Sequence, residues 1–150
     1  MLSGSEITTT EQVGRYALSH YVDNSEIVVV VFASAGARFG GPIEEFKGSL
    51  LKYGVSMLFV RDRDASWFHE PETPDMFAKV AEMVKSYKKV AVLGESMGGS
   101  GALIFPRFCD KIDRTLAFSP LYSFAYPFNQ FAASWNNDVH PRYWPLILKT

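Results

Sequence analysis

Short apolar runs alternate with amphipathic segments along most of this chain. The runs Ile27–Phe32, Val55–Val60 and Val90–Leu93 are rich in apolar and β-branched residues and contain almost no polar side chains. Such runs are typical of strands that are buried on both faces of a parallel sheet. Thr115–Phe118 predicts a fourth strand.

The segments between these runs have apolar residues at helical intervals. Pro42, with Glu44 and Glu45 after it, predicts a helix that ends at Gly54. Thr73-Pro74-Asp75 predicts the capped start of another helix. The apolar face of that helix consists of Met76, Phe77, Val80, Val84 and Tyr87.

A third helical pattern precedes the first strand. Val13, Tyr16 and Ala17 share one side of a short helix predicted over Glu11–Leu18, and His20 near its end is expected at the surface. Strands that alternate with helices in this way predict an α/β fold, with a mostly parallel sheet and helices on both of its faces.

The strand at Val90–Leu93 leads directly into Gly94-Glu95-Ser96-Met97-Gly98, and a small-residue helix follows. This G-x-S-x-G spacing between a strand and a helix is typical of a nucleophile elbow, in which a strained turn exposes a serine hydroxyl. Glycines are expected beside the turn because a Cβ there would collide with neighbouring backbone. Ser96 is therefore the candidate nucleophile, and the amide of Met97 is a candidate oxyanion donor.

In these segments the chain resembles the α/β-hydrolase superfamily, specifically the bacterial α/β-hydrolase-like proteins often found with surface-polysaccharide genes. The residues that carry the resemblance are Val28–Ser34, Leu58–Asp62 with Trp67 and Phe68, Gly94–Gly99 and Leu116–Pro120. The resemblance implies a three-layer α/β sandwich in which the predicted strands have the order second-first-third-fourth. It also implies a serine esterase or acyltransferase, with an acylated carbohydrate as a candidate substrate and with no cofactor.

Two loops are expected at the same end of the sheet as Ser96. By resemblance, the loop after the first predicted strand supplies the second oxyanion amide, from Ser34 or Ala35. The loop after the second strand leaves a carboxyl end, where open α/β sheets bind their ligands. Trp67 on that loop is a candidate for substrate contact or for anchoring the loop, and His69 is a candidate substitute base. At the start of the loop, Arg61 and Asp62 are expected to form a local ion pair rather than a catalytic dyad.

The acid and base of a catalytic triad are harder to locate. His140 is the one histidine after Ser96, and Asp138 precedes it by two residues. The resembling fold supplies its triad in the chain order serine, acid, histidine, from loops after later strands. Asp138 and His140 are thus candidates, yet neither follows a recognisable strand, and His140 ranks second to His69 as a substitute base within this sequence. We accordingly expect residues 1–150 to be one domain, the first part of a longer hydrolase fold, with an exposed sheet edge that can pair with a second copy.

Composition narrows the functional classes further. A formal net charge of −1 without a basic stripe argues against nucleic-acid partners. Cys109 is the only cysteine, so an internal disulfide and a cysteine-based metal site are excluded. The longest apolar run, Ile27–Ala33, is too short to span a bilayer. A cytoplasmic protein without membrane partners and without a metal is expected.

Two alternatives belong to other functional classes. The chain could be a catalytically silent or incomplete hydrolase-like module that acts through its surface. Alternatively, Gly98–Gly101 at a helix N-terminus could bind a phosphate through free amides. The turn, however, has neither the G-x-x-x-x-G-K-[ST] nor the G-x-G-x-x-G spacing of nucleotide-binding loops.

Overall fold

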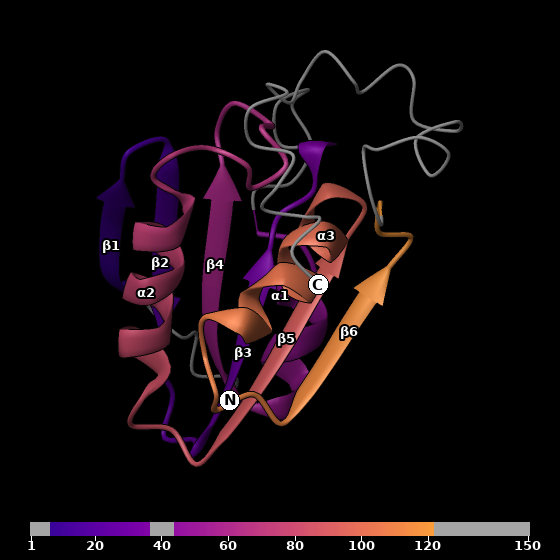
Figure 1. Ribbon diagram of the computed structural model, residues 1–150. Coiled ribbons are helices and arrows are strands. Elements are labelled where there is room, and N and C mark those ends of the chain that lie inside the picture. Colours follow the sequence, from indigo (N-terminus) through magenta and orange to yellow (C-terminus); the bar gives the residue numbers. More distant parts are fainter. Residues whose placement is uncertain (1–6, 37–43, 122–150) are drawn as a thin grey trace.

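A computed structural model describes residues 7–36 and 44–121, which form one sheet with helices on both faces (Figure 1). The strands are β1 (Ile7–Val13), β2 (Tyr16–Tyr21), β3 (Ile27–Phe32), β4 (Ser56–Asp62), β5 (Lys89–Glu95) and β6 (Arg114–Phe118). The helices are α1 (Lys47–Leu50), α2 (Thr73–Val84) and α3 (Met97–Ile104), with the 3-10 turns η2 (Leu51–Tyr53) and η3 (Phe105–Arg107).

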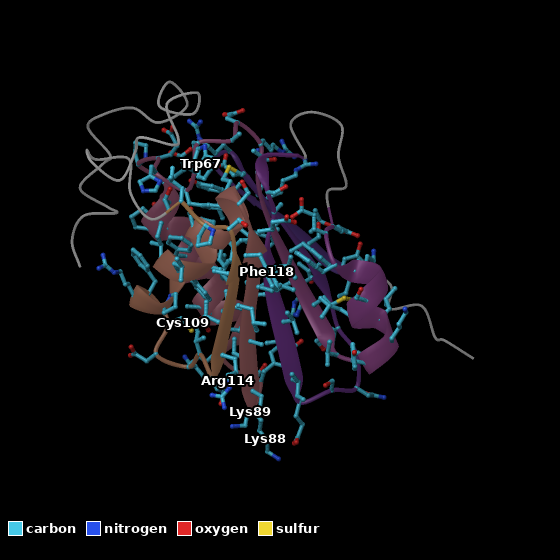
Figure 2. The ribbon with its side chains drawn as sticks, turned by 90° about the vertical axis from the view of Figure 1, so that its right-hand side faces the viewer. Trp67, Lys88, Lys89, Cys109, Arg114 and Phe118 are labelled. Atoms are coloured by element: carbon cyan, nitrogen blue, oxygen red, sulfur yellow. The ribbon has the colours of Figure 1, made fainter. Side chains whose placement is uncertain are left out.

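The sheet has six strands in the order β1-β2-β4-β3-β5-β6. β4, β3, β5 and β6 run parallel to one another, whereas β1 and β2 are antiparallel to their neighbours. The predicted order of the parallel strands, second-first-third-fourth, is therefore confirmed, as is the α/β class. Chain crossovers place α2 and α3 against one face and α1 with η2 against the other, as the side view in Figure 2 shows.

The alternation of side chains along β3 explains why its whole run is apolar. Val28, Val30 and Phe32 belong to the core beneath α2 and α3, whereas Val29 and Val31 belong to the core on the α1 side. Each face of this central strand is thus covered by its own apolar layer. The face predicted for α2 is also confirmed, because all of its members lie in the core: Met76, Phe77, Val80, Val84 and Tyr87.

The helix predicted over Glu11–Leu18 is wrong. The segment forms an antiparallel hairpin of β1 and β2 that turns at Gly14, whose φ is 56°. Tyr16 and Leu18 are fully buried on one side of β2, a two-residue period that the helical interpretation overlooked. His20 follows in the same alternation and is buried rather than exposed, with its Nε2 2.9 Å from the hydroxyl of Tyr87.

The helix predicted from Pro42 to Gly54 is shorter than expected within the described residues. Helical backbone spans Lys47–Leu50 and continues as a 3-10 turn through Tyr53, and Gly54 ends it in the left-handed conformation with a φ of 57°. The start of α2 also differs in detail. The helix begins at Thr73, but its hydroxyl accepts a hydrogen bond from the backbone amide of Glu70 rather than from a helical amide.

The β6 strand forms one edge of the described sheet. Its Leu116 and Phe118 are about half exposed (48% and 49%) on the same side of the strand.

At the end of the sheet opposite Trp67, the basic residues Lys88, Lys89 and Arg114 gather (Figure 2). No helix among residues 7–36 and 44–121 has the length and apolar character to cross a membrane.

Candidate active site

The parallel strands bring four loops to one end of the sheet, the end at which these strands finish. Phe32 is in register with Val60 of β4 and with Gly94 of β5, and Glu95 is in register with Phe118 of β6. The chain therefore leaves β3, β4, β5 and β6 at the same end, where the arrowheads lie in Figure 1. Open α/β sheets bind ligands at this carboxyl edge.

Ser96 is at the sharp turn from β5 into α3. Its backbone has φ 52° and ψ −118°, a conformation rarely adopted by residues with a side chain. The amide of Ser96 donates to the carbonyl oxygen of Phe118 at 2.8 Å, which ties the turn to the neighbouring strand. The residue itself remains partly exposed. Strain of this kind, held by surrounding structure, is a feature of functional sites.

The flanking glycines are required by close backbone packing. A Cβ on Gly94 would lie 2.1 Å from the carbonyl oxygen of Gly98, and a Cβ on Gly98 would lie 2.0 Å from that of Phe32. Neither contact can be relieved by moving a flexible side chain, since both partners are backbone atoms. The elbow therefore has the packing that the G-x-S-x-G spacing predicted.

The first amides of α3 face the space around Ser96. The first helical bond is from the amide of Ser100 to the carbonyl oxygen of Ser96 at 3.1 Å. The amide of Met97 has no hydrogen-bond partner among residues 7–36 and 44–121, while its side chain is fully buried. The amide is thus available to an oxyanion, and the helix dipole favours negative charge there.

The loop after β3 contains the two candidates for the second oxyanion amide. The backbone amide of Ser34 donates to Glu45 Oε2 at 3.0 Å, and the Ser34 hydroxyl donates to Glu45 Oε1. Gly36 donates its amide to the Ser34 hydroxyl oxygen at 3.1 Å. The amide of Ala35, in contrast, has no partner within the described part of the chain. The two candidates are thereby distinguished, because Glu45 occupies the amide of Ser34.

The loop after β4 is organised by the buried carboxylate of Asp62. One of its oxygens accepts bonds from the amide and hydroxyl of Ser66 at 2.8 and 2.7 Å and from the amide of Phe68 at 3.3 Å. Burial raises the pKa of Asp62, and these hydrogen bonds oppose that rise. None of the ion pairs between described residues joins Arg61 to Asp62, so the local pair expected from the sequence is wrong.

The backbone of this loop turns so that Trp67 lies in the interior of the protein. Ala65, Trp67 and Phe68 all have left-handed backbone, with φ between 52° and 61°. Trp67 is 2% exposed and Phe68 is fully buried. The Phe68 ring stacks on Tyr16 at 5.8 Å and meets Phe32 edge-on at 5.3 Å. Of the two roles predicted for Trp67, this placement supports anchoring of the loop.

His69 lies at the end of the same loop and is fully buried. Its Nδ1 donates to the carbonyl oxygen of Trp67, so the proton of the neutral ring sits on Nδ1. Burial lowers the pKa of His69 to about 4, which keeps the ring neutral near pH 7. Among the described residues, the Ser96 hydroxyl forms no hydrogen bond with a histidine.

The remaining predicted residues are placed as follows. Asp138 and His140 lie outside the described residues. Glu45 and Asp62 were not predicted as site residues, because their partners are reached through space and not through a local motif. In the described portion of the chain, no group of histidine, cysteine and carboxylate side chains is arranged to bind a metal ion.

Comparison with solved structures identifies the fold. A capsule O-acetyltransferase of Neisseria meningitidis serogroup A superposes with a TM-score of 0.61 at 12% identity, over 99% of this chain and 64% of its own. Est1E from Butyrivibrio proteoclasticus matches at 0.54 and 20% identity, over 77% of this chain and 51% of its own. This chain has an α/β-hydrolase fold.

A third α/β-hydrolase structure is similar over nearly the whole chain. The Pyrococcus furiosus esterase Pf2001 matches with a TM-score of 0.53 at 19% identity, over 97% of this chain and 64% of its own. This chain thus spans between 51% and 64% of the lengths of these three α/β-hydrolases. No family model matches the sequence, and no curated protein matches it.

Proposed function

We propose that this α/β-hydrolase chain carries the nucleophile of an ester hydrolase or acyltransferase, and that the nucleophile is Ser96. The observation that supports this most strongly is the strained backbone of Ser96, with φ 52° and ψ −118°, between two glycines that no other residue can replace sterically. The fold maintains a strained backbone at Ser96, and this conformation presents the serine hydroxyl at the carboxyl end of the parallel strands. A purely structural turn gains nothing from that strain.

In the proposed reaction, Ser96 Oγ attacks the carbonyl carbon of an ester while its proton passes to a base. The resulting oxyanion accepts hydrogen bonds from the amide of Met97 at the start of α3 and from the amide of Ala35 in the loop after β3. Collapse of the intermediate expels the alcohol, which takes up the proton from the base, and leaves the acyl group on Ser96. Water or an acceptor hydroxyl then attacks the acyl-enzyme and restores the serine.

We assign the second oxyanion donor to Ala35 rather than to Ser34. Glu45 already accepts from the amide and hydroxyl of Ser34 and fixes the start of the loop. The role of Ser34 in this proposal is to orient the next amide. His140 is proposed as the base with Asp138 as its orienting acid, and His69 is the alternative base. The fully buried His69 ring makes it the weaker choice.

The substrate class is proposed from resemblance. A capsule O-acetyltransferase is among the structures with this fold, and the sequence resembles proteins found with surface-polysaccharide genes. An acylated carbohydrate, or another small ester, is the proposed substrate of this chain in the cytoplasm. The exposed Leu116 and Phe118 on the edge strand β6 support a further proposal, pairing with a second copy.

Turnover of p-nitrophenyl acetate tests the assignment of the reaction. Turnover that is lost in Ser96→Ala and in His140→Ala, but retained in His69→Ala, is the expected result. Turnover that is lost in His69→Ala but retained in His140→Ala would identify His69, on the loop after β4, as the base. Turnover that persists in Ser96→Ala would contradict the nucleophile, and circular dichroism of each variant controls for misfolding.

A further inference from the structure

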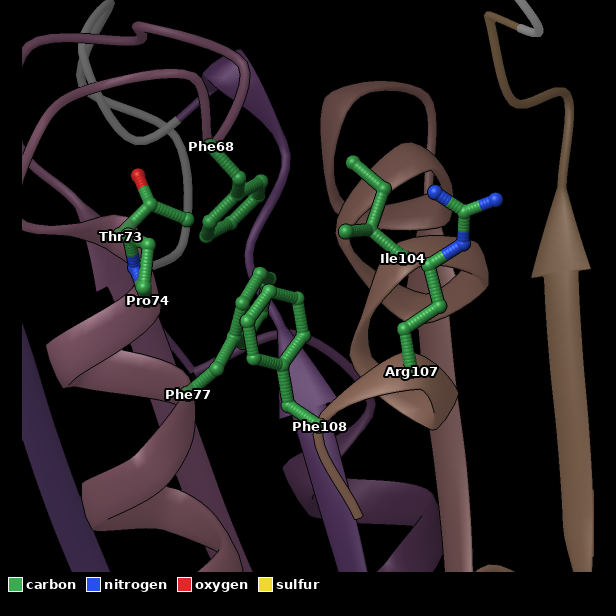
Figure 3. Close-up of a pocket in the computed structure, with 7 residues that line it drawn as sticks. All are labelled: Phe68, Thr73, Pro74, Phe77, Ile104, Arg107 and Phe108. Carbon is green, nitrogen blue, oxygen red and sulfur yellow. The ribbon is translucent and has the colours of Figure 1, made fainter. Parts of the chain in front are cut away.

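A cavity of about 170 Å³ lies on the α2 and α3 face of the sheet, away from the Ser96 turn. Figure 3 shows Phe68, Thr73 and Pro74 on one side of it and Ile104 and Arg107 on the other. Phe77 and Phe108 lie between these two sides. The cavity is therefore built by α2, by the end of α3 with η3, and by the loop that Asp62 organises.

The lining is almost entirely apolar. Phe68 and Phe77 are fully buried at its base, while Pro74, Ile104 and Phe108 are half-buried around it. Among the described lining residues, the one polar uncharged group is the Thr73 hydroxyl, which already bonds to the hydroxyl of Tyr16 at 2.5 Å and to the amide of Glu70 at 3.0 Å. A ligand would consequently meet aromatic and aliphatic carbon here. For scale, an apolar cavity of roughly 150 Å³ holds a benzene molecule.

One full positive charge stands at this apolar cavity. Arg107 is exposed and forms no ion pair or hydrogen bond with the described residues, unlike Arg15, which bonds to Asp64, Glu70 and Glu72. Its methylene stem runs along the wall beside Ile104, and its guanidinium group lies at the α3 side of the cavity (Figure 3). Guanidinium groups bind carboxylates with two parallel hydrogen bonds.

We propose that this cavity binds a small carboxylic acid whose apolar body is about the size of one aromatic ring. The ring or short alkyl chain would pack against Phe77, Phe108 and Ile104, and the carboxylate would pair with Arg107. Charge complementarity selects a monoanion, because Arg107 is the single cation among the described residues that line the cavity. This binding site is separate from the ester chemistry proposed at Ser96 and does not depend on it.

Binding of phenylacetate to the 150-residue chain tests the proposal, with phenylacetamide as the uncharged analogue. Titration calorimetry should give a Kd for phenylacetate on the order of 1 mM, as expected of a ligand with few atoms. Phenylacetamide should bind about three- to tenfold more weakly, since it lacks the charge that pairs with Arg107. In NMR spectra, phenylacetate should shift the resonances of Ile104 and Phe108.

Variants locate the site. Arg107→Gln should weaken phenylacetate binding about three- to tenfold and leave phenylacetamide unchanged, whereas the matched charge removal Lys52→Gln, on the opposite face of the sheet, should change neither. Ile104→Trp should occlude the cavity to both ligands, and Ser96→Ala should bind both as the parent chain does. Equal affinity for the two ligands, no binding of either, an Arg107→Gln variant with unchanged affinity, or loss of binding in Ser96→Ala would each overturn the proposal.

Discussion

The carbonyl oxygen of Phe32 lies 2.0 Å from the point where a Cβ on Gly98 would stand. The end of β3 and the first turn of α3 are therefore in direct backbone contact. This contact sets the distance between the Ser96 turn and the loop that contains Ser34 and Ala35. In the proposed mechanism the two oxyanion amides belong to these two segments, so the same contact fixes their spacing.

Gly98→Ala should consequently destabilise the protein. The added methyl group must displace backbone, and overpacking of this kind costs about 1–3 kcal/mol of the free energy of unfolding. Gly48→Ala is the matched control, because a Cβ at Gly48 has no atom within 4 Å. Urea unfolding of both variants measures the difference. Equal stability of the two would show that the turn has room for a side chain.

Asp62→Asn should loosen the loop after β4. The amide side chain keeps one acceptor oxygen but loses the charge that strengthens the bonds to Ser66 and Phe68. We expect a loss of about 1–3 kcal/mol in the free energy of unfolding. Asp64→Asn makes the same change at an exposed carboxylate two residues later and should have little effect. If Asp62→Asn were as stable as Asp64→Asn, the claim that Asp62 stabilises this loop would be contradicted.

Glu45 should influence the reactivity of Ser96 through the loop after β3. In Glu45→Ala the amide and hydroxyl of Ser34 lose their acceptor, and the neighbouring Ala35 amide is no longer fixed. The second-order rate of Ser96 modification by a fluorophosphonate should fall about tenfold. Glu44→Ala, which disturbs the bonds to Tyr21 and Lys47 instead, serves as the control. A faster reaction of Glu45→Ala would mean that the carboxylate blocks the site rather than orienting it.

His69 should make the stability of the protein depend on pH. Burial lowers its pKa from 6.5 to about 4 in the folded chain, so the unfolded chain binds more protons between these values. The contribution of the neutral His69 ring to the free energy of unfolding is therefore fully present above pH 6.5. It is lost as the pH falls towards 4, by about 3 kcal/mol in total. Urea unfolding at several pH values should show this decline, and His69→Gln should reduce it. An unchanged slope in His69→Gln would contradict the lowered pKa.

Local patterns were sufficient to predict the central strands and the elbow. The strands β3, β4 and β5 each contain an apolar run of four or more residues, and the G-x-S-x-G spacing encodes its own steric requirement at Gly94 and Gly98. The hairpin of β1 and β2 was missed because Glu11–Leu18 fits a helical stripe as well as a strand alternation. Its true period depends on pairing with β4, about forty residues away along the chain.

The supporting groups of the site could not be predicted for a related reason. Glu45 meets Ser34 across a loop, and the Tyr16 and Phe68 rings stack although they belong to separate strands and loops. Such contacts depend on the folded geometry and leave no spacing motif in the sequence. Pairing of Asp62 with the adjacent Arg61 was expected, whereas the burial of Asp62 favours backbone amides as its partners.

The most direct test of the central claim is the site of covalent modification by a fluorophosphonate. The 150-residue chain is treated with the probe, digested, and analysed by mass spectrometry. Our account predicts modification at Ser96 and no modification of the Ser96→Ala variant. Ser100→Ala should be labelled normally, because the Ser100 hydroxyl of the parent chain is buried and bonds to the backbone of Leu121. Modification of another residue, or labelling that persists in a folded Ser96→Ala variant, would contradict Ser96 as the nucleophile.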